Sequence, residues 1–138
     1  MLPKVYLKAL FVVVNQIKGG FPLAKGLSPQ LEEKIKRYQS LQQQIGSVQQ
    51  QIQALKIEQM DVDKALKEIE ERPDDEICYR SIGRLLVKAT IKETKTKLKD
   101  QRELAETRIK LSEKSLDKLK KQFDEIEKEL KAAFEGGK

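Results

Sequence analysis

The sequence contains no histidine and no tryptophan, and it has a single cysteine among its 138 residues. Without histidine, acid–base catalysis by imidazole and metal sites with histidine ligands are excluded. Cys78 has no partner for an intrachain disulfide, which fits a reducing compartment, and we expect it to be a structural thiol in a strand. Glycine-rich phosphate loops, Cys-x-x-Cys pairs and Gly-x-Ser-x-Gly elbows are also missing. The sequence therefore predicts a protein that is not an enzyme and that requires no metal or cofactor.

Aromatic residues make up only 5% of the chain, whereas charged residues make up 36%. This composition is poor material for a thick globular core and is typical of elongated helices. Two packed helices share only a narrow seam, so much of the stability of such a small chain must come from further subunits. We therefore expect one domain that associates with other chains.

Acidic residues are missing from the beginning of the chain. Residues 1–26 contain four lysines and no acidic residue, so the remainder carries 24 basic residues against 22 acidic ones. Acidic and basic residues alternate along this remainder, whereas a nucleic-acid binder usually concentrates Lys and Arg on one face. We expect a solvated helical surface and no nucleic-acid partner, and the near-neutral remainder argues against a basic helical hairpin that binds nucleic acid.

Residues 1–26 are apolar and punctuated by glycine, unlike the rest of the chain. Their apolar run is interrupted by Lys8 and is shorter than the ~20 residues that span a bilayer. Three interpretations stay open for this N-terminal extension, taken as residues 1–27: a start codon assigned too early, an added apolar contact surface, or a targeting segment. The first is preferred, and no membrane partner is expected.

A first helix is predicted over residues 28–72. Ser28 is a suitable N-cap, Pro29 suits the first helical position, and Pro73 disfavours helical geometry just before it. Between them apolar residues recur every seven positions, which is typical of a coiled-coil seam. The two lines of this seam are Leu31, Tyr38, Ile45, Ile52 and Leu66, and Leu41, Val48, Leu55, Val62 and Ile69.

Two short runs of apolar and β-branched residues follow, at 77–82 and 85–89. Gly83 and Arg84 lie between them, a spacing that suits a two-residue hairpin turn with glycine at the strained position. A two-stranded hairpin alone is not stable in water, and its unpaired edges invite further strands. We therefore predict a hairpin over residues 77–89 that assembles with neighbouring subunits.

A second helix is predicted over residues 90–135, because Thr90 and Glu93 have the spacing of a capping box. Its seam lines are Ile109, Leu116, Phe123 and Leu130, and Ile91, Leu98, Ala105, Leu119 and Ile126. The predicted fold class is mostly α: two long helices form an antiparallel coiled coil and are joined by a single β-hairpin. Together they form a domain of residues 28–138.

Folding the chain back about the hairpin brings the two seams into one constant register. In this register Tyr38 meets Phe123, whereas the polar Gln59 lies near Arg102. The polar interruptions of the two seams therefore coincide, which predicts a thinner middle section.

The segment from Pro73 to Lys88 reads Pro-Asp-Asp-Glu-Ile-Cys-Tyr-Arg-Ser-Ile-Gly-Arg-Leu-Leu-Val-Lys and lies between two heptad helices. This arrangement resembles the prefoldin family, specifically its β-type subunit. The family's Tyr-x-x-x-Gly-x-x-Leu-Val-Lys core is matched by Tyr79, Gly83, Leu86, Val87 and Lys88. The resemblance covers residues 28–134, and residues 1–26 have no counterpart in it.

This resemblance implies an ATP-independent molecular chaperone, a holdase of the cytoplasm. In the archaeal form, two α-type and four β-type subunits join through their hairpins into a hetero-hexamer with a β-barrel platform, from which the coiled coils project. The resemblance further implies that unfolded client proteins are held at the tips of the coiled coils and are passed to a cytosolic chaperonin.

Two sets of candidate residues follow from this comparison. The oligomerisation set in the hairpin is Tyr79, Ile82, Gly83, Leu85, Leu86 and Val87. The client-binding set at the tips is Leu27, Leu31, Ile35, Tyr38, Phe123, Ile126, Leu130 and Phe134. Apolar residues at helical spacing usually only close the coil, but a two-helix end cannot bury all of these side chains. Ile35 and Phe134 lie off or beyond the seam, so they are the preferred client contacts.

The alternative function is a structural or tethering coiled-coil protein that is anchored through its apolar N-terminal segment. The same seams would serve such a protein. A tether needs only a loop between its helices, whereas Gly83 and the Thr90 cap specify an ordered β unit. The chaperone interpretation is therefore preferred.

Overall fold

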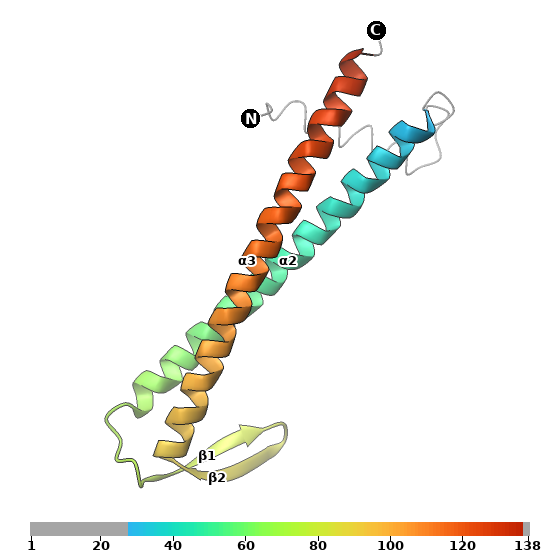
Figure 1. Cartoon of the computed structure of the whole chain (residues 1–138). Helices are drawn as coiled ribbons and strands as arrows, with labels where there is room; N and C mark the ends of the chain where they lie inside the picture. The colour runs from blue at the N-terminus through green and yellow to red at the C-terminus, as the bar shows by residue number, and fades with distance from the viewer. Residues whose placement is uncertain (1–27, 137–138) are drawn as a thin grey trace. The chain divides into compact units, whose positions relative to one another are not determined.

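The computed structural model describes residues 28–136, which form two long helices with a two-stranded hairpin between them (Figure 1). In chain order the elements are helix α2 (Pro29–Ile69), strand β1 (Ile77–Ile82), strand β2 (Leu85–Thr90) and helix α3 (Ile91–Gly136). The predicted fold class is confirmed. The expectations about residues 1–27, including the division of the chain there and the client contact at Leu27, lie outside the described residues.

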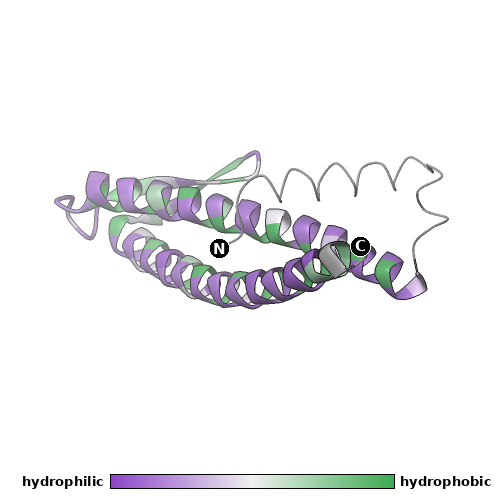
Figure 2. Ribbon diagram, turned by 90° about the horizontal axis from the view of Figure 1, so that it is seen from above, coloured by the Kyte–Doolittle hydropathy of each residue, from purple (hydrophilic) through white to green (hydrophobic). Residues whose placement is uncertain are grey.

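The described residues belong to two compact units, and both helices contribute to each of them. The terminal unit contains residues 28–47 and 117–136, and the hairpin unit contains Val48–Leu116. Figure 2 shows hydrophobic residues recurring among hydrophilic ones along each helix, as the heptad pattern predicts. Each unit therefore has its own apolar seam.

Both helices begin at the side-chain caps that the sequence predicts. The amide of Leu31 donates to Oγ of Ser28 at 3.2 Å, and the amide of Glu93 donates to Oγ1 of Thr90 at 3.2 Å. These amides lie in the first helical turn, where no carbonyl of the same helix can accept their hydrogens. A capping hydroxyl of this kind stabilises a helix by about 0.5–2 kcal/mol.

Helix α2 ends at Ile69, three residues before the predicted end. The amide of Arg72 donates to the carbonyl of Ile69 at 3.2 Å, which is a tighter turn than the hydrogen-bond ladder of an α-helix. Pro73 has no amide hydrogen and disfavours helical geometry in the residue before it. The effect of the proline therefore extends one turn further back than the sequence analysis assumed.

The core of the terminal unit is built from both helices. Its buried residues are Ile35, Tyr38, Leu41, Ile126 and Leu130, with Leu31, Leu119 and Phe123 packed against them. The rings of Tyr38 and Phe123 stack with their centroids 4.7 Å apart, which confirms the predicted pairing. Such a pair contributes about 0.5–1.5 kcal/mol beyond the burial of its area.

Ile35 is 1% exposed, so the prediction that it lies off the seam is wrong. The strict heptad line passes through position 34, but Lys34 reaches Glu129 instead, with 3.8 Å between Nζ and Oε2. Ile35 occupies the inward position one residue later. A helix has 3.6 residues per turn rather than 3.5, so its buried stripe drifts away from a strict seven-residue line.

The hairpin unit has a narrower core, and ion pairs flank it. Its buried apolar residues are Ile52, Val62, Ile91, Ala105 and Ile109. Lys56 pairs with Glu113 at 3.9 Å, and Asp63 pairs with Arg102 at 3.5 Å. Arg102 therefore pairs with Asp63, whereas the predicted register had placed Gln59 near it. Exposed pairs of this kind each contribute only about 0.2–1 kcal/mol.

Strands β1 and β2 pair antiparallel, from Ile77 opposite Thr90 to Ile82 opposite Leu85. Gly83 has a φ of 58°, and no other described residue has a positive φ. Glycine at the first of two turn positions is typical of a type II′ hairpin turn, whose twist matches that of the strands. The predicted turn, with glycine at the strained position, is confirmed.

Replacing Gly46 and Gly83 by alanine should change the free energy of unfolding in opposite directions. Gly46 lies inside α2, and an added Cβ would meet no atom within 4 Å, so Gly46→Ala should raise the free energy of unfolding by about 0.5–1 kcal/mol. Gly83→Ala should lower it by about 1–2 kcal/mol, because of its positive φ. Urea unfolding at one fixed protein concentration measures both, and a lower midpoint for Gly46→Ala would contradict a regular helix at that residue.

Candidate functional site

The base of the hairpin is joined to the start of α3 through backbone hydrogen bonds. The amide of Ile91 donates to the carbonyl of Glu76 at 2.9 Å, and the amide of Lys92 donates to the carbonyl of Asp74 at 3.1 Å. These are first-turn amides that the helix itself cannot satisfy. The connection between α2 and β1 therefore serves as the acceptor that holds this helix end in place.

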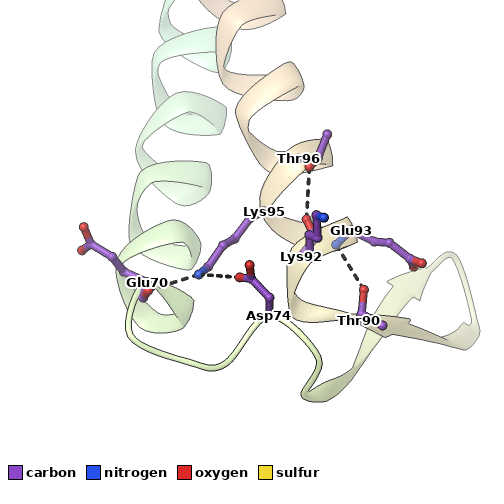
Figure 3. A network of polar contacts seen from close by, with 7 residues as sticks. All are labelled: Glu70, Asp74, Thr90, Lys92, Glu93, Lys95 and Thr96. Atoms are coloured by element: carbon purple, nitrogen blue, oxygen red, sulfur yellow. Dashed lines mark hydrogen bonds and ion pairs between the residues drawn. The ribbon is translucent and has the colours of Figure 1, made fainter.

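Lys95 adds a side-chain link to the same connection (Figure 3). Its Nζ donates to the carbonyl oxygen of Glu70 at 3.1 Å and lies 3.5 Å from Oδ1 of Asp74. The Lys95 side chain is mostly buried, whereas that of Asp74 is exposed. The Lys95 ammonium group thus links Glu70, directly after α2, to Asp74 in the following turn, and it helps to fix the base of the hairpin.

One face of the hairpin lies against α3 at its base. Sγ of Cys78 lies 3.1 Å from Oγ1 of Thr94, and Cys78 is half-buried. Ala89, the strand partner of Cys78, is also half-buried. The thiol lies in a strand, as the sequence analysis predicts, and Arg80, two residues further along β1, is half-buried as well.

The rest of the hairpin exposes large apolar side chains. They are Ile77, Tyr79, Ile82, Leu85, Leu86 and Val87, and five of them belong to the predicted oligomerisation set. Leu86 is 73% exposed and Leu85 is 68% exposed. Successive residues of a strand point to opposite faces, so these two neighbours expose apolar surface on both faces of the sheet. An arrangement of this kind is typical of a surface that another protein covers.

The predicted client-binding set contributes mainly to the core of the terminal unit. Ile35, Tyr38, Ile126 and Leu130 are buried, and Leu31 and Phe123 are partly buried. Phe134 is 39% exposed. Of the two preferred client contacts, Ile35 is therefore inaccessible in this structure, and Phe134 is open to solvent.

Four exposed apolar residues of the helices were missed by the sequence analysis. They are Ile57 and Met60 in α2, and Leu104 and Leu111 in α3. Leu104 and Leu111 are seven residues apart and so share one face of the helix. That spacing is visible in the sequence, but it lies outside the two apolar seam lines of the helix.

Glu127 is the one buried charged residue among the described side chains. It is 6% exposed, and its Oε1 accepts no hydrogen bond. Burial, followed by the negative charge of Asp124, raises the pKa of the Glu127 carboxyl above its ordinary value of 4.5. Burial and the charge of Glu127 likewise raise the pKa of the Tyr38 hydroxyl. The terminal unit therefore contains a charge that its apolar surroundings disfavour.

Among residues 28–134, whose side chains the structure describes, no group of three or more cysteine, aspartate or glutamate side chains could hold a metal ion. Neither of the two helices described is apolar enough over a sufficient length to cross a membrane.

The sequence and the structure both match known proteins. Residues 32–137 match the model of a family described as prefoldin subunit. The chain belongs to the prefoldin family. It is 33% identical over 110 residues to prefoldin subunit beta of Thermococcus kodakarensis, an alignment that covers 80% of this chain and 94% of the relative. It is 34% identical over 102 residues to the same subunit of Pyrobaculum calidifontis, covering 74% of this chain and 82% of the relative.

A solved prefoldin has the same fold. The crystal structure of the prefoldin beta subunit from Thermococcus strain KS-1 matches with a TM-score of 0.68 and 34% identity, and the match covers 77% of this chain and 93% of that one. The resemblance that the hairpin motif predicted is therefore confirmed, and the chain belongs to a family of chaperones. The prefoldin match begins at residue 32, after the N-terminal extension.

Replacing the buried carboxylate should stabilise this prefoldin chain. We expect Glu127→Gln to raise the free energy of unfolding at pH 7 by about 1 kcal/mol, because a neutral amide loses less on leaving water than a carboxylate does. In the wild type the Glu127 carboxyl binds a proton more tightly in the folded chain than in the unfolded chain. The ionised Glu127 carboxylate therefore destabilises the fold fully at neutral pH. This destabilisation is lost as the pH falls through the raised pKa, and it is absent below 4.5.

The measurement is urea unfolding of both proteins from neutral pH down to the ordinary pKa of the carboxyl. The advantage of Glu127→Gln should shrink over this window. Glu125→Gln, the same change at an exposed position of α3, is the control and should show no such trend. An advantage of Glu127→Gln that is independent of pH would contradict the burial of a charge.

Proposed function

We propose that this chain is a β-type subunit of a prefoldin that holds unfolded proteins without ATP and without catalysing a reaction. Membership of the prefoldin family supports the chaperone role. The observation that carries the proposal is the hairpin, which exposes large apolar side chains on both faces. A tether or a simple spacer has no use for such a surface.

The proposed partner in assembly is an α-type prefoldin subunit, in a hexamer of two α-type and four β-type chains. Both outer edges of the two-stranded sheet have backbone groups that β1 and β2 do not pair with each other. Strands of neighbouring subunits would pair with these edges and would cover Leu85 and Leu86 on opposite faces. The anchored base of the hairpin supports this role, because a rigid element loses less entropy on association.

The proposed clients are unfolded proteins, which would be held at the terminal unit and passed to a cytosolic chaperonin in the cytoplasm. Phe134 is the exposed apolar group that supports a contact there. Partly buried Leu31 and Phe123 border the same core and would add to the contact if the helix ends separate. Apolar contacts of this kind recognise non-native chains without a sequence preference. No cofactor is needed for such binding.

Assembly should depend on the exposed leucines of the hairpin. We expect Leu85→Asp to abolish the hexamer formed with the α-type subunit, because a carboxylate buried in an apolar interface is strongly disfavoured. Leu104→Asp makes the same change at an exposed leucine outside the hairpin and should leave the native mass unchanged. Native mass spectrometry measures both, and a hexamer of normal stability with Leu85→Asp would contradict the assignment.

Client capture should depend on Phe134 while assembly does not. We expect Phe134→Ser to weaken the suppression of aggregation of a chemically unfolded client by about threefold or more, because an exposed apolar contact is lost. Ile57→Ser removes an exposed apolar side chain from α2 and is the control. Full suppression by an intact Phe134→Ser hexamer would show that clients do not use this residue.

A further inference from the structure

The two flanks of the hairpin unit differ in character. One flank contains the ion pairs Lys56–Glu113 and Asp63–Arg102. Residues two positions apart on a helix point about 200° apart, so Leu104 and Leu111 lie opposite Arg102 and Glu113 respectively. One side of α3 therefore carries charged residues in ion pairs with α2, and the opposite side exposes two leucines.

The leucine flank contains a groove between the two helices. Its volume is ≈ 490 Å³, and its lining residues are Gln51, Ala54, Leu55, Arg108, Leu111 and Ser112. Leu111 is 62% exposed, and Leu104 is 51% exposed two helical turns earlier on the same face. Ser112 lies on the α3 seam line between Ala105 and Leu119, so a small polar side chain stands at this seam position in the lining of the groove.

Arg108 gives the groove a positive charge. It lies four residues after Leu104 and three residues before Leu111, so all three side chains share one face of α3. Arg108 is exposed and forms no ion pair with any described residue. The surface therefore presents two apolar groups with an available guanidinium between them, which favours an occupant with apolar side chains and a carboxylate.

The size of this surface argues against a permanent subunit contact. A stable protein interface buries about 800 Å² on each partner, far more than two leucines and a groove for a few side chains can supply. A groove of this volume lies toward the small end of the range of about 300–1,000 Å³ that binds drug-sized molecules. It suits a short stretch of chain that binds and leaves quickly.

We propose that this groove binds an extended, non-native segment of a client protein that carries apolar side chains and a carboxylate. The inference rests on the holdase function proposed above and adds a contact in the hairpin unit to the contact at Phe134. Leu111 in the groove and Leu104 on the same face of α3 beside it bind the apolar side chains, and Arg108 binds the carboxylate. The groove therefore favours segments that combine apolar side chains with a carboxylate over other segments that an unfolded chain exposes.

The test uses the full chain assembled with its α-type partner. The variant is Leu104→Gln combined with Leu111→Gln, and the control is Ile57→Gln combined with Met60→Gln. Ile57 and Met60 are 50% and 57% exposed, nearly the same as the two leucines, but they do not line the groove. The probe is a short fluorescein-labelled peptide with leucines and one glutamate in a serine and glycine background, and a second peptide has lysine in place of glutamate.

We expect the leucine variant to weaken binding of the glutamate peptide about tenfold and the control to change it less than twofold, because only the first removes groove contacts. Arg108→Gln should abolish the preference for glutamate over lysine. Equal binding by the leucine variant and the control would overturn the proposal. A changed native mass of the leucine variant would also overturn it, since the leucines would then belong to a subunit interface.

Two further outcomes separate this proposal from other occupants and from the holdase function itself. Tighter peptide binding after removal of residues 1–27 would overturn it, because the groove would then be covered by the chain's own N-terminal extension. A wild-type complex that fails to suppress aggregation of an unfolded client would count against the holdase function. Groove-dependent suppression of aggregation, lost in the leucine variant and kept in its control, would support both.

Discussion

Two helices that pack side by side can bury only one stripe of each, and the rest of this structure follows from that limit. In the terminal unit the buried stripe consists of the cluster around Tyr38 and Leu130. In the hairpin unit it consists of the narrower row around Ile109. Other large apolar side chains of the described residues, such as Leu86 and Leu104, remain exposed to water. These exposed groups are the ones proposed above to contact other proteins, so the thin core and the proposed binding surfaces have one cause.

The hairpin depends on a different kind of support, since it has no core of its own. Its base is fixed by hydrogen bonds between the start of α3 and the connection that follows α2, with Lys95 between them. Polar contacts hold this base in place, and the apolar side chains of the strands remain exposed. The chain therefore separates the groups that position the hairpin from those proposed to bind partners, so a partner would bury the strands without disturbing their attachment.

Much of this arrangement could be read from local signals in the sequence. Ser28, Thr90 and Gly83 each have a steric or hydrogen-bonding role that only few residue types fulfil, and the pairing of Tyr38 with Phe123 follows from the register of two long repeats. The burial of Ile35 could not be read in this way, because it depends on the slow drift of a helical stripe away from a seven-residue line. The groove beside Leu111 was also hidden, since its walls come from two helices and no single repeat describes it.

The two-residue type II′ turn at Gly83 limits which changes in the hairpin sequence keep its two faces as they are. Neighbouring strand residues face opposite ways, so the two-residue length of the turn decides which face receives Leu85 and which receives Leu86. One inserted residue would exchange their faces along a whole strand, whereas many substitutions within the strands would leave the faces as they are. The hairpin can therefore vary its side chains to suit a new neighbour far more easily than it can vary the length of its turn.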